Sequence, residues 1–161
     1  ELWKGICSVM AAVHEVRGFY HKDLKPENIV ILRKNTGTKI YVIDFGISGP
    51  SGFRNIGTAR YMAPEQREIR RDIFLSSSTD VFSLGLIGYE LLTGRVPEIG
   101  IDYTYNARSS RWEKSPDITA DVGLGEAGRL KRIIDQATAM RPEDRYRNAG
   151  ELYAALKNLR L

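Results

Sequence analysis

The residues best suited to chemistry lie close together near the start of the chain, in the run Tyr20-His21-Lys22-Asp23-Leu24-Lys25-Pro26-Glu27-Asn28. Another acid, Asp44, follows after a short β-rich stretch. Carboxylate and amide oxygens are the hard ligands that Mg²⁺ prefers, and a lysine ammonium can act as a point charge toward a phosphate. These residue types therefore suit a site that holds a cation and a phosphate.

Three motifs follow one another in order along the chain. His21-x-Asp23, with Asn28 five positions after the Asp, resembles the catalytic loop of protein kinases. Asp44-Phe45-Gly46 resembles the motif whose Asp holds magnesium, and Ala63-Pro64-Glu65 resembles the end of the activation segment. Each motif alone is a weak signal, but the three in order are hard to obtain by chance. The chain therefore resembles a protein kinase.

The resemblance implies a role for each matching residue in transfer of the γ-phosphate of ATP to a protein hydroxyl. Asp23 would accept or orient the hydroxyl proton as a general base, and Lys25 would reach the transferring phosphate. Asn28 and Asp44 would hold Mg²⁺. Val30 would support the adenine ring from below while packing as an ordinary strand residue. The expected cofactors are therefore ATP and Mg²⁺.

Two residues favour Ser and Thr over Tyr as acceptors. In the family, a lysine at the position of Lys25 marks Ser/Thr specificity. Thr58 in Gly57-Thr58-Ala59-Arg60-Tyr61 matches the Thr that bonds to the catalytic Asp and Lys. The alternative is that Thr58 is itself phosphorylated. Ser48 and Ser51 are further candidate phosphorylation sites, for which the more ordinary interpretation is a flexible loop serine.

Other matching residues are expected to hold the site together. Glu65 and Arg145 resemble a buried kinase ion pair that joins the activation segment to the helical base. Asp80 resembles the acid that braces the catalytic-loop backbone. His21 and Phe45 resemble the stacked apolar spine between the loop and the metal motif, so a core role for His21 is favoured over a catalytic one.

The resemblance covers essentially the whole chain, but only the second half of a kinase domain. No Gly-rich loop precedes a predicted strand, and no Val-Ala-Ile-Lys-like segment occurs in the sequence. We therefore expect residues 1–161 to form the C-terminal lobe, with the N-terminal lobe elsewhere in a longer protein, and the isolated chain to be a weak or inactive enzyme. The alternative is a lone lobe whose role is binding.

Three functions compete. A protein Ser/Thr kinase leads, and the runs that begin at Thr79, Glu90 and Arg141 resemble its bacterial branch. A noncatalytic interaction module of kinase-like fold is the main alternative, against which the intact acidic and amide positions of the motifs argue. A small-molecule phosphotransferase comes third. The segment that ends in Ala63-Pro64-Glu65 argues against it, because this segment builds the peptide-binding shelf of protein kinases.

The elements that would position the first motifs are a helix and a hairpin. Apolar residues at three- and four-residue spacing predict a helix that Gly18 ends, with one face formed by Leu2, Ile6, Val9, Val13 and Val16. Residues 29–32 and 39–43 predict two strands, and the Asn and Gly of 35–38 suit the turn between them. The candidate catalytic loop would connect this helix to this hairpin.

The rest of the chain is expected to be mainly helical. Residues 76–79 offer N-caps for an apolar helix that begins near Asp80 and ends at Gly94 and Pro97. Residues 99–125 are polar and irregular, with room for a short helix. Two more helices are predicted, one on the spacing of Leu130, Ile133, Ile134 and Ala137, and one from a capping box of Asn148 and Glu151 through Leu159. The fold class is mainly α with a small β-hairpin by the catalytic loop, α+β in a full kinase.

Composition and net charge indicate the class of protein, its partners and its compartment. The 161 residues are 42% hydrophobic and 27% charged, which is typical of folded globular domains. The net charge of +4 is spread along the chain and indicates neither nucleic acid nor a membrane as a partner. The apolar run 81–92 is too short for a membrane span. A single cysteine, Cys7, points to a reducing compartment, so cytoplasm is expected. The expected partners are ATP and a protein substrate with Ser or Thr.

Overall fold

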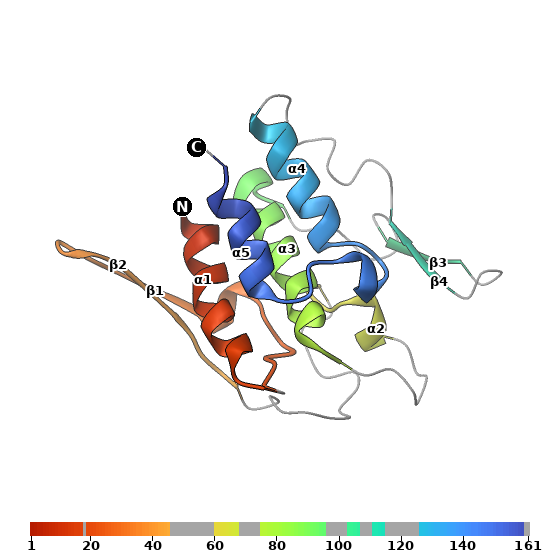
Figure 1. Cartoon of the computed structure of the whole chain (residues 1–161), viewed down its shortest axis with the longest axis horizontal. Helices are drawn as coiled ribbons and strands as arrows, with labels where there is room; N and C mark the ends of the chain where they lie inside the picture. The colour runs from red at the N-terminus through yellow and green to blue at the C-terminus, as the bar shows by residue number, and fades with distance from the viewer. Residues whose placement is uncertain are drawn as a thin grey trace.

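The computed structural model describes residues 1–17, 19–45, 60–67, 75–95, 103–106, 111–114 and 126–159 (Figure 1). Helices in these ranges are α1 (Leu2–Glu15), α2 (Pro64–Arg67), α3 (Ser77–Thr93), α4 (Glu126–Ala137) and α5 (Ala149–Lys157). Two antiparallel pairs of strands accompany them, β1 (Ile29–Lys34) with β2 (Gly37–Val42), and β3 (Tyr103–Asn106) with β4 (Arg111–Lys114). The described part of the chain is thus mainly helical, as predicted.

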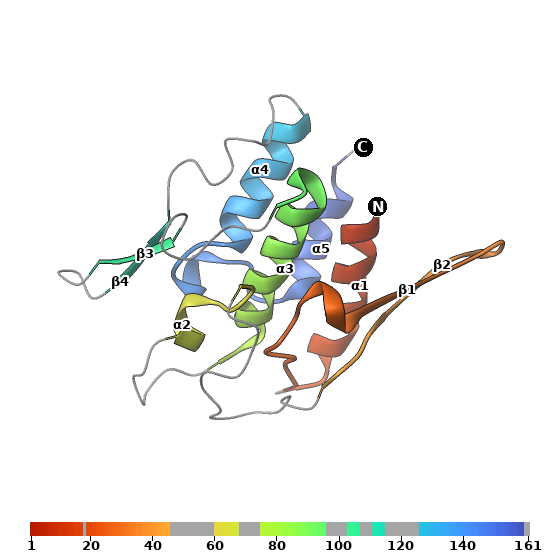
Figure 2. The same ribbon diagram turned by 180° about the vertical axis from the view of Figure 1, so that it is seen from behind.

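Helix α3 is the centre of the helical body. Helices α1, α4 and α5 pack around it (Figures 1 and 2), and every residue from Ser78 to Tyr89 is buried. A helix enclosed on all sides needs no polar face, which explains the long apolar run. Ser76 and Thr79 form the N-terminal capping box, and Gly94 ends the helix in the left-handed conformation with φ of 74°. The helix is therefore confirmed, with its start at Ser77.

Helix α1 is confirmed, but its buried face differs from the predicted one. The buried residues are Trp3, Ile6, Cys7 and Met10, whereas Val16 lies beyond the helix and is 59% exposed. Of the five residues assigned to the apolar face, Ile6 alone is buried. Trp3 fixes which face of α1 is turned toward α3, because its indole ring lies against Gly88 and its Nε1 donates to the Leu84 carbonyl at 2.9 Å.

The β1–β2 hairpin is confirmed and is longer than predicted. Lys34 pairs with Gly37, so the turn is Asn35-Thr36 and the strands extend closer to it than expected. Gly37 has φ of 127°, which favours glycine. The Ile40 side chain of β2 lies against Gly5 of α1, while the turn end of the ribbon projects away from the helices (Figure 1). The base of the ribbon is thereby fixed to α1.

Residues 99–125 contain strands that the sequence did not predict. The described part of this range is the β3–β4 pair, in which Tyr103 lies opposite Lys114. Both strands have only four residues, which is too short for an alternating pattern to stand out against a polar background. The expectation of a short helix is wrong for these residues, and the rest of the range lies outside those described.

The last two helices confirm the prediction, with one change at a cap. Asn148 Oδ1 accepts a hydrogen bond from the Glu151 amide at 3.0 Å, which is the first half of a capping box. The Glu151 carboxylate accepts from the Arg147 amide at 2.8 Å instead of the Asn148 amide. The reciprocal bond of the capping box is therefore shifted by one residue. Helix α5 ends at Lys157, two residues before the predicted end at Leu159.

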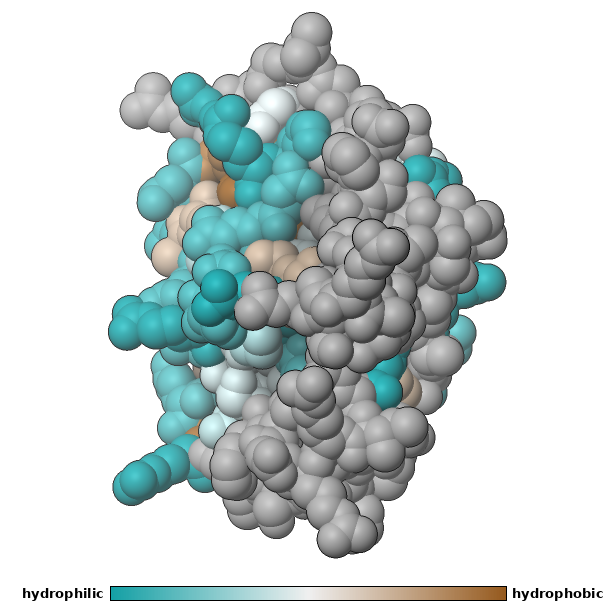
Figure 3. All heavy atoms as spheres, turned by 90° about the vertical axis from the view of Figure 1, so that its right-hand side faces the viewer, coloured by the Kyte–Doolittle hydropathy of each residue, from teal (hydrophilic) through white to brown (hydrophobic). Residues whose placement is uncertain are grey.

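On the side seen in Figure 3, the described residues are mostly hydrophilic, with small hydrophobic patches between them. None of the helices in the described ranges has both the length and the apolar character that a membrane crossing requires.

Gly18, Pro97 and the predicted loop from Ser48 to Asn55 lie outside the described residues.

Candidate active site

Asp23 and Lys25 form an ion pair in the connection between α1 and β1. Lys25 Nζ lies 2.8 Å from Asp23 Oδ2, and the side chains of Lys25 and Asp23 are 20% and 15% exposed. The pKa of Lys25 is raised, mainly by the hydrogen bond to Asp23 and further by the charges of Asp23, Glu27 and Asp44. The ammonium group thus lies within the field of three acids, while both partners of the ion pair remain within reach of solvent.

Asn28 joins this connection to the hairpin. It ends the 3-10 turn η1 (Pro26–Asn28), and it is buried. Its Nδ2 donates to the Asp23 carbonyl at 3.0 Å, and its own backbone carbonyl accepts from the Ile43 amide at 2.9 Å. Because the two polar atoms of an amide point apart, the first bond directs Oδ1 away from the Asp23 backbone. Asp44 follows Ile43 directly, so Asn28 and Asp44 lie at the same end of the ribbon.

Asn28 and Asp44 carry oxygen donors of the type that a magnesium ion prefers. One carboxylate and one amide oxygen are hard donors, and Mg²⁺ commonly takes one or two protein ligands and completes its octahedron with phosphate oxygens and waters. Within the described ranges, no cluster of three or more His, Cys, Asp or Glu side chains could hold a metal ion.

Backbone strain falls on the same two segments. Among the described residues, the non-glycine positions with positive φ are Lys22 at 68° and Asp44 at 64°. Such conformations cost about 1–3 kcal/mol each and persist only where the surroundings hold them. Lys22 immediately precedes Asp23, and Asp44 is itself a candidate ligand. One strained residue therefore lies next to the candidate base, and the other is the candidate metal ligand itself.

His21 links these two segments. Its Nε2 donates to the Ile43 carbonyl at 2.9 Å, and its Nδ1 accepts from the Asp23 amide at 3.3 Å. Its ring also contacts the Phe45 ring, with centroids 4.7 Å apart. A carbonyl can only accept and an amide N–H can only donate, so both ring nitrogens are committed. The expected core position of His21 is confirmed, since the residue is fully buried.

Asp80 braces the backbone before the candidate base. Its two carboxylate oxygens accept from the amides of His21 and Lys22, both at 2.7 Å. Asp80 is fully buried in the first turn of α3, where the helix dipole also favours a negative charge. The expected bracing contact is therefore present.

His14 is a member of this network that the sequence analysis missed. Its Nε2 donates to Asp80 Oδ2 at 3.0 Å, and its Nδ1 accepts from the Ala149 amide at the start of α5. The His14 side chain is only 2% exposed. The spacing of Trp3, Cys7, Met10 and His14 could have revealed it, because these residues continue the face of α1 that is actually buried.

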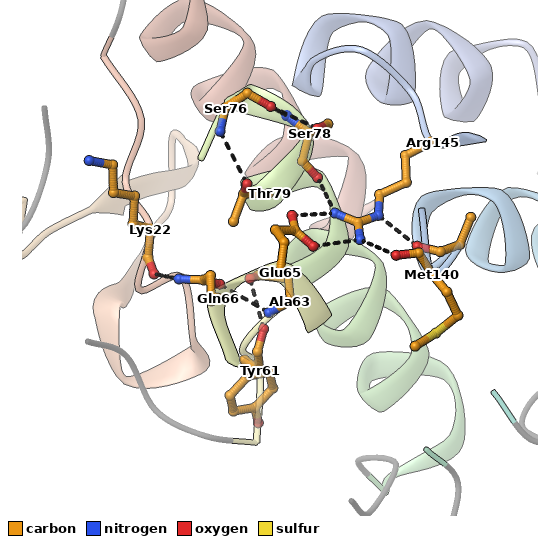
Figure 4. A network of polar contacts seen from close by, with 12 residues as sticks. Lys22, Tyr61, Ala63, Glu65, Gln66, Ser76, Ser78, Thr79, Met140 and Arg145 are labelled. Carbon is orange, nitrogen blue, oxygen red and sulfur yellow. Dashed lines mark hydrogen bonds and ion pairs between the residues drawn. The ribbon is translucent and has the colours of Figure 1, made fainter. Parts of the chain in front are cut away.

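Glu65 and Arg145 form the expected buried ion pair. Arg145 Nη1 and Nη2 lie 2.7 and 2.8 Å from the two Glu65 oxygens (Figure 4). The side chains of Arg145 and Glu65 are 0% and 4% exposed. A two-pronged Arg–carboxylate contact has both strength and a defined geometry. Helix α2, which ends the candidate substrate-binding segment, is thereby anchored to the C-terminal part of the chain.

Tyr61, in the same segment, is anchored to α3. Its hydroxyl donates to Glu90 Oε2 at 2.7 Å, and its carbonyl accepts from Ser83 Oγ at 2.8 Å. The pKa of Tyr61 is raised, first by burial and then by the hydrogen bond and charge of Glu90. The hydroxyl therefore remains a hydrogen-bond donor over the ordinary pH range.

Some of the candidate residues lie in the described part of the chain, and others lie outside it. Val30 lies in β1 opposite Tyr41 and is partly buried, a position compatible with the expected strand role. Thr58, Ser48, Ser51 and Gly46 lie outside the described residues. Asp23, Lys25, Asn28 and Asp44 gather where the α1–β1 connection meets the base of the hairpin.

Comparison with known proteins agrees with this arrangement. The family model described as protein kinase domain matches residues 1–154. The chain is 35% identical over 163 residues to serine/threonine-protein kinase Pkn1 of Myxococcus xanthus, covering 94% of this chain and 22% of that protein. It is 32% identical over 164 residues to serine/threonine-protein kinase PknB of Mycobacterium leprae, covering 97% of this chain and 25% of that protein.

A third similar protein is serine/threonine-protein kinase PknB of Mycobacterium tuberculosis, 34% identical over 159 residues, with 93% of this chain and 24% of that protein covered. The chain spans about a quarter of the length of these curated relatives. The family match runs from α1 into α5, so it includes the braced loop, the hairpin and the Glu65–Arg145 pair. On these grounds the chain belongs to the protein kinase domain family.

Proposed function

We propose that residues 1–161 form the C-terminal lobe of a Ser/Thr protein kinase, and that the whole protein transfers the γ-phosphate of ATP to Ser or Thr hydroxyls of a protein substrate. The observation that carries this proposal is the 2.8 Å contact between Lys25 Nζ and Asp23 Oδ2, with Asn28 bonded to the Asp23 backbone. A base, a cation and an amide ligand are thereby held on one short connection.

Asp23 is the proposed base. Phosphoryl transfer asks a protein mainly to position the reactants and to offset charge on the equatorial oxygens. As the acceptor oxygen bonds to phosphorus and the bond to the leaving phosphate breaks, the hydroxyl proton passes to the Asp23 carboxylate. Lys25 keeps its proton, since its pKa is raised by the bond to Asp23, and offsets negative charge on the transferring group.

Asn28 Oδ1 and the Asp44 carboxylate are the proposed magnesium ligands. With Mg²⁺ held by these two side chains, the site would offset negative charge on the phosphates of ATP. The hydrogen bond between the Asn28 carbonyl and the Ile43 amide keeps the two ligands at the same end of the hairpin. Val30 would support the adenine ring from the first strand. Thr58 would bond to Asp23 and Lys25, a role that rests on the family motif.

We propose that an N-terminal lobe supplies the contacts that hold the phosphates of ATP. Protein kinases use a Gly-rich loop that precedes a strand and a strand lysine paired with a helix glutamate for this purpose. In this sequence no Gly-rich loop precedes a predicted strand, and no Val-Ala-Ile-Lys-like segment occurs to supply that lysine. We therefore expect little or no transfer by the 161 residues alone.

Transfer of label from radioactive ATP with Mg²⁺ to a generic protein substrate tests the proposal. The proteins to compare are the 161-residue chain, the longest reading frame that contains it, and that longer form with Asp23→Asn. The longer wild type should label Ser or Thr, and Asp23→Asn should lower the rate by about 10²–10⁴-fold. Glu15→Gln, at an exposed position on α1, is the matched control and should leave the rate unchanged.

Two results would overturn this function. One is a folded longer protein that labels no substrate while it binds a partner protein tightly, which would favour the interaction module. The other is an Asp23→Asn variant as fast as the wild type, which would remove Asp23 from the reaction.

A further inference from the structure

Gln66 bridges the candidate substrate-binding segment and the catalytic loop. It lies in α2, directly after Glu65, and is only 1% exposed. Its Nε2 donates to the Lys22 carbonyl at 2.7 Å, and its Oε1 accepts from the Ala63 amide at 3.0 Å (Figure 4). One buried amide therefore contacts two segments that are more than forty positions apart in the sequence.

The carbonyl that Gln66 binds belongs to the peptide group that carries Asp23. The amide at the other end of this group, Asp23 N–H, donates to His21 Nδ1 at 3.3 Å. Gln66 and His21 thus hold opposite poles of the Lys22–Asp23 peptide. Rotation of this peptide would turn the Cα–Cβ direction of Asp23, and with it the carboxylate. The orientation of the candidate base therefore depends on these two contacts.

The Gln66 contact falls at a strained point of the backbone. Lys22 has φ of 68°, which a residue with a side chain adopts only when its neighbours hold it there. Asp80 holds the Lys22 amide at 2.7 Å, and Gln66 holds the Lys22 carbonyl at the same distance. Without the Gln66 donor, a buried carbonyl would lose its partner at the residue that is already strained.

Gln66 is itself held firmly. Its neighbour Glu65 is paired with Arg145 through two hydrogen bonds of 2.7 and 2.8 Å. Gln66 also uses its Oε1 on the Ala63 amide, which leaves Nε2 directed at Lys22. The same turn of helix therefore binds the helical base through Glu65 and the catalytic loop through Gln66.

We propose that Gln66 is a positioning residue for phosphoryl transfer, acting through the Lys22 carbonyl to set the orientation of the Asp23 carboxylate. This inference rests on the proposed function of Asp23. It also couples the substrate-binding segment to the base, because a shift of α2 that moves Gln66 must move or release the Lys22–Asp23 peptide.

Two substitutions separate the two bonds of Gln66. Gln66→Glu keeps an oxygen toward the Ala63 amide and, in its ionised form, replaces the donor toward Lys22 by an acceptor, whereas Gln66→Met removes both bonds at nearly the same length. Thr138→Val is the matched control, since it removes a buried side-chain bond to the Ile134 carbonyl on α4. All are made in the longest reading frame that contains the chain, with melting temperatures measured alongside the rates.

We expect both Gln66 variants to lower kcat by about 10- to 100-fold, the range for a displaced catalytic group. The KM for ATP should change by less than about threefold, because the proposed nucleotide ligands are untouched. Thr138→Val should lower the melting temperature and leave kcat unchanged. A Gln66→Glu enzyme with wild-type kcat would overturn the proposal, since only the Ala63 bond would then matter. So would a kcat loss in Thr138→Val equal to that of the Gln66 variants.

Hydrogen exchange tests the same inference without any activity. Amide exchange in a peptide that contains Lys22 and Asp23 should be at least about tenfold faster in Gln66→Glu than in wild type, and unchanged in Thr138→Val. Unchanged exchange in a folded Gln66→Glu protein would overturn the inference, and Gln66→Glu carries the test if Gln66→Met does not fold. If no form transfers phosphate, the proposed function fails while exchange still decides whether Gln66 holds this peptide.

Discussion

Arg145 binds Glu65 across 80 positions of sequence, through two hydrogen bonds of 2.7 and 2.8 Å. Its remaining donor capacity goes to backbone carbonyls of Ser78, Ala139 and Met140 (Figure 4). Its guanidinium also lies 4.8 Å from the centre of the Phe82 ring. One side chain thus joins α2, the start of α3 and the connection between α4 and α5.

Neutralising Glu65 should therefore be costly. Glu65→Gln keeps the shape of the side chain but leaves the buried guanidinium without its opposite charge, which commonly costs about 3–5 kcal/mol. We expect a loss of this size in the free energy of unfolding, measured by urea denaturation. The matched control is Glu143→Gln, because the Arg141–Glu143 pair is exposed on both sides. It should leave the midpoint unchanged. Equal stabilities of the two variants would contradict a structural role for the buried pair.

Loss of His14 should loosen the support of the candidate catalytic loop. His14→Leu leaves the Ala149 amide without its acceptor and the Asp80 carboxylate without one donor. Each unsatisfied buried group costs about 1–3 kcal/mol, so we expect a loss of about 2–4 kcal/mol in unfolding free energy. Glu15→Ala, one residue further along α1 and exposed, should have no measurable effect. A His14→Leu protein as stable as Glu15→Ala would show that water replaces both contacts.

Local features of the site could be predicted from the sequence. The motif around Asp23, the Asp44 position and the hairpin depend on neighbouring residues, and the turn and cap residues carry the signal directly. The Glu65–Arg145 pair could be predicted only through family resemblance, because no local rule connects positions 80 residues apart.

Contacts made by single polar side chains across the fold could not be predicted. His14 and Gln66 each satisfy a buried group on a distant segment. The spacing along α1 can indicate that His14 is buried, but no periodic pattern identifies the distant partner of either side chain. The apolar face of α1 was misplaced for a related reason. This helix packs against α5, α3 and β2, so apolar residues occur on more than one side and periodicity does not select among them.

The pKa of Lys25 should depend on Asp23 more than on any other acid. Its pKa is raised first by the hydrogen bond to Asp23, with smaller contributions from the charges of Asp23, Glu27 and Asp44. A lysine with a raised folded pKa contributes stability that is fully present below its unfolded pKa, about 10.4. That stability is lost as pH rises through the folded value.

We therefore expect Asp23→Asn to lower the pKa of Lys25 toward its ordinary value, and Glu27→Gln to lower it less. NMR titration of the Lys25 side chain with labelled lysine measures both shifts. The loss of stability that Lys25 causes at alkaline pH should therefore be smaller in Asp23→Asn than in wild type, because the folded and unfolded pKa values of Lys25 then lie closer together. An unchanged Lys25 pKa in Asp23→Asn would mean that the ion pair does not persist in solution.

The close approach of α1 to α3 depends on Gly88. A methyl group added there would overlap the Trp3 ring, whose Nε1 is also held by the Leu84 carbonyl. Gly88→Ala should therefore displace Trp3 and lower the free energy of unfolding by about 1–3 kcal/mol. Gly128, in α4, has nothing within 4 Å of an added methyl group, so Gly128→Ala should raise stability by about 0.5–1 kcal/mol through helix propensity. Urea unfolding followed by tryptophan fluorescence measures the stability of both variants. A Gly88→Ala protein as stable as Gly128→Ala would contradict the packing of α1 on α3. It would also contradict the position of the candidate catalytic loop, because α1 leads into that loop.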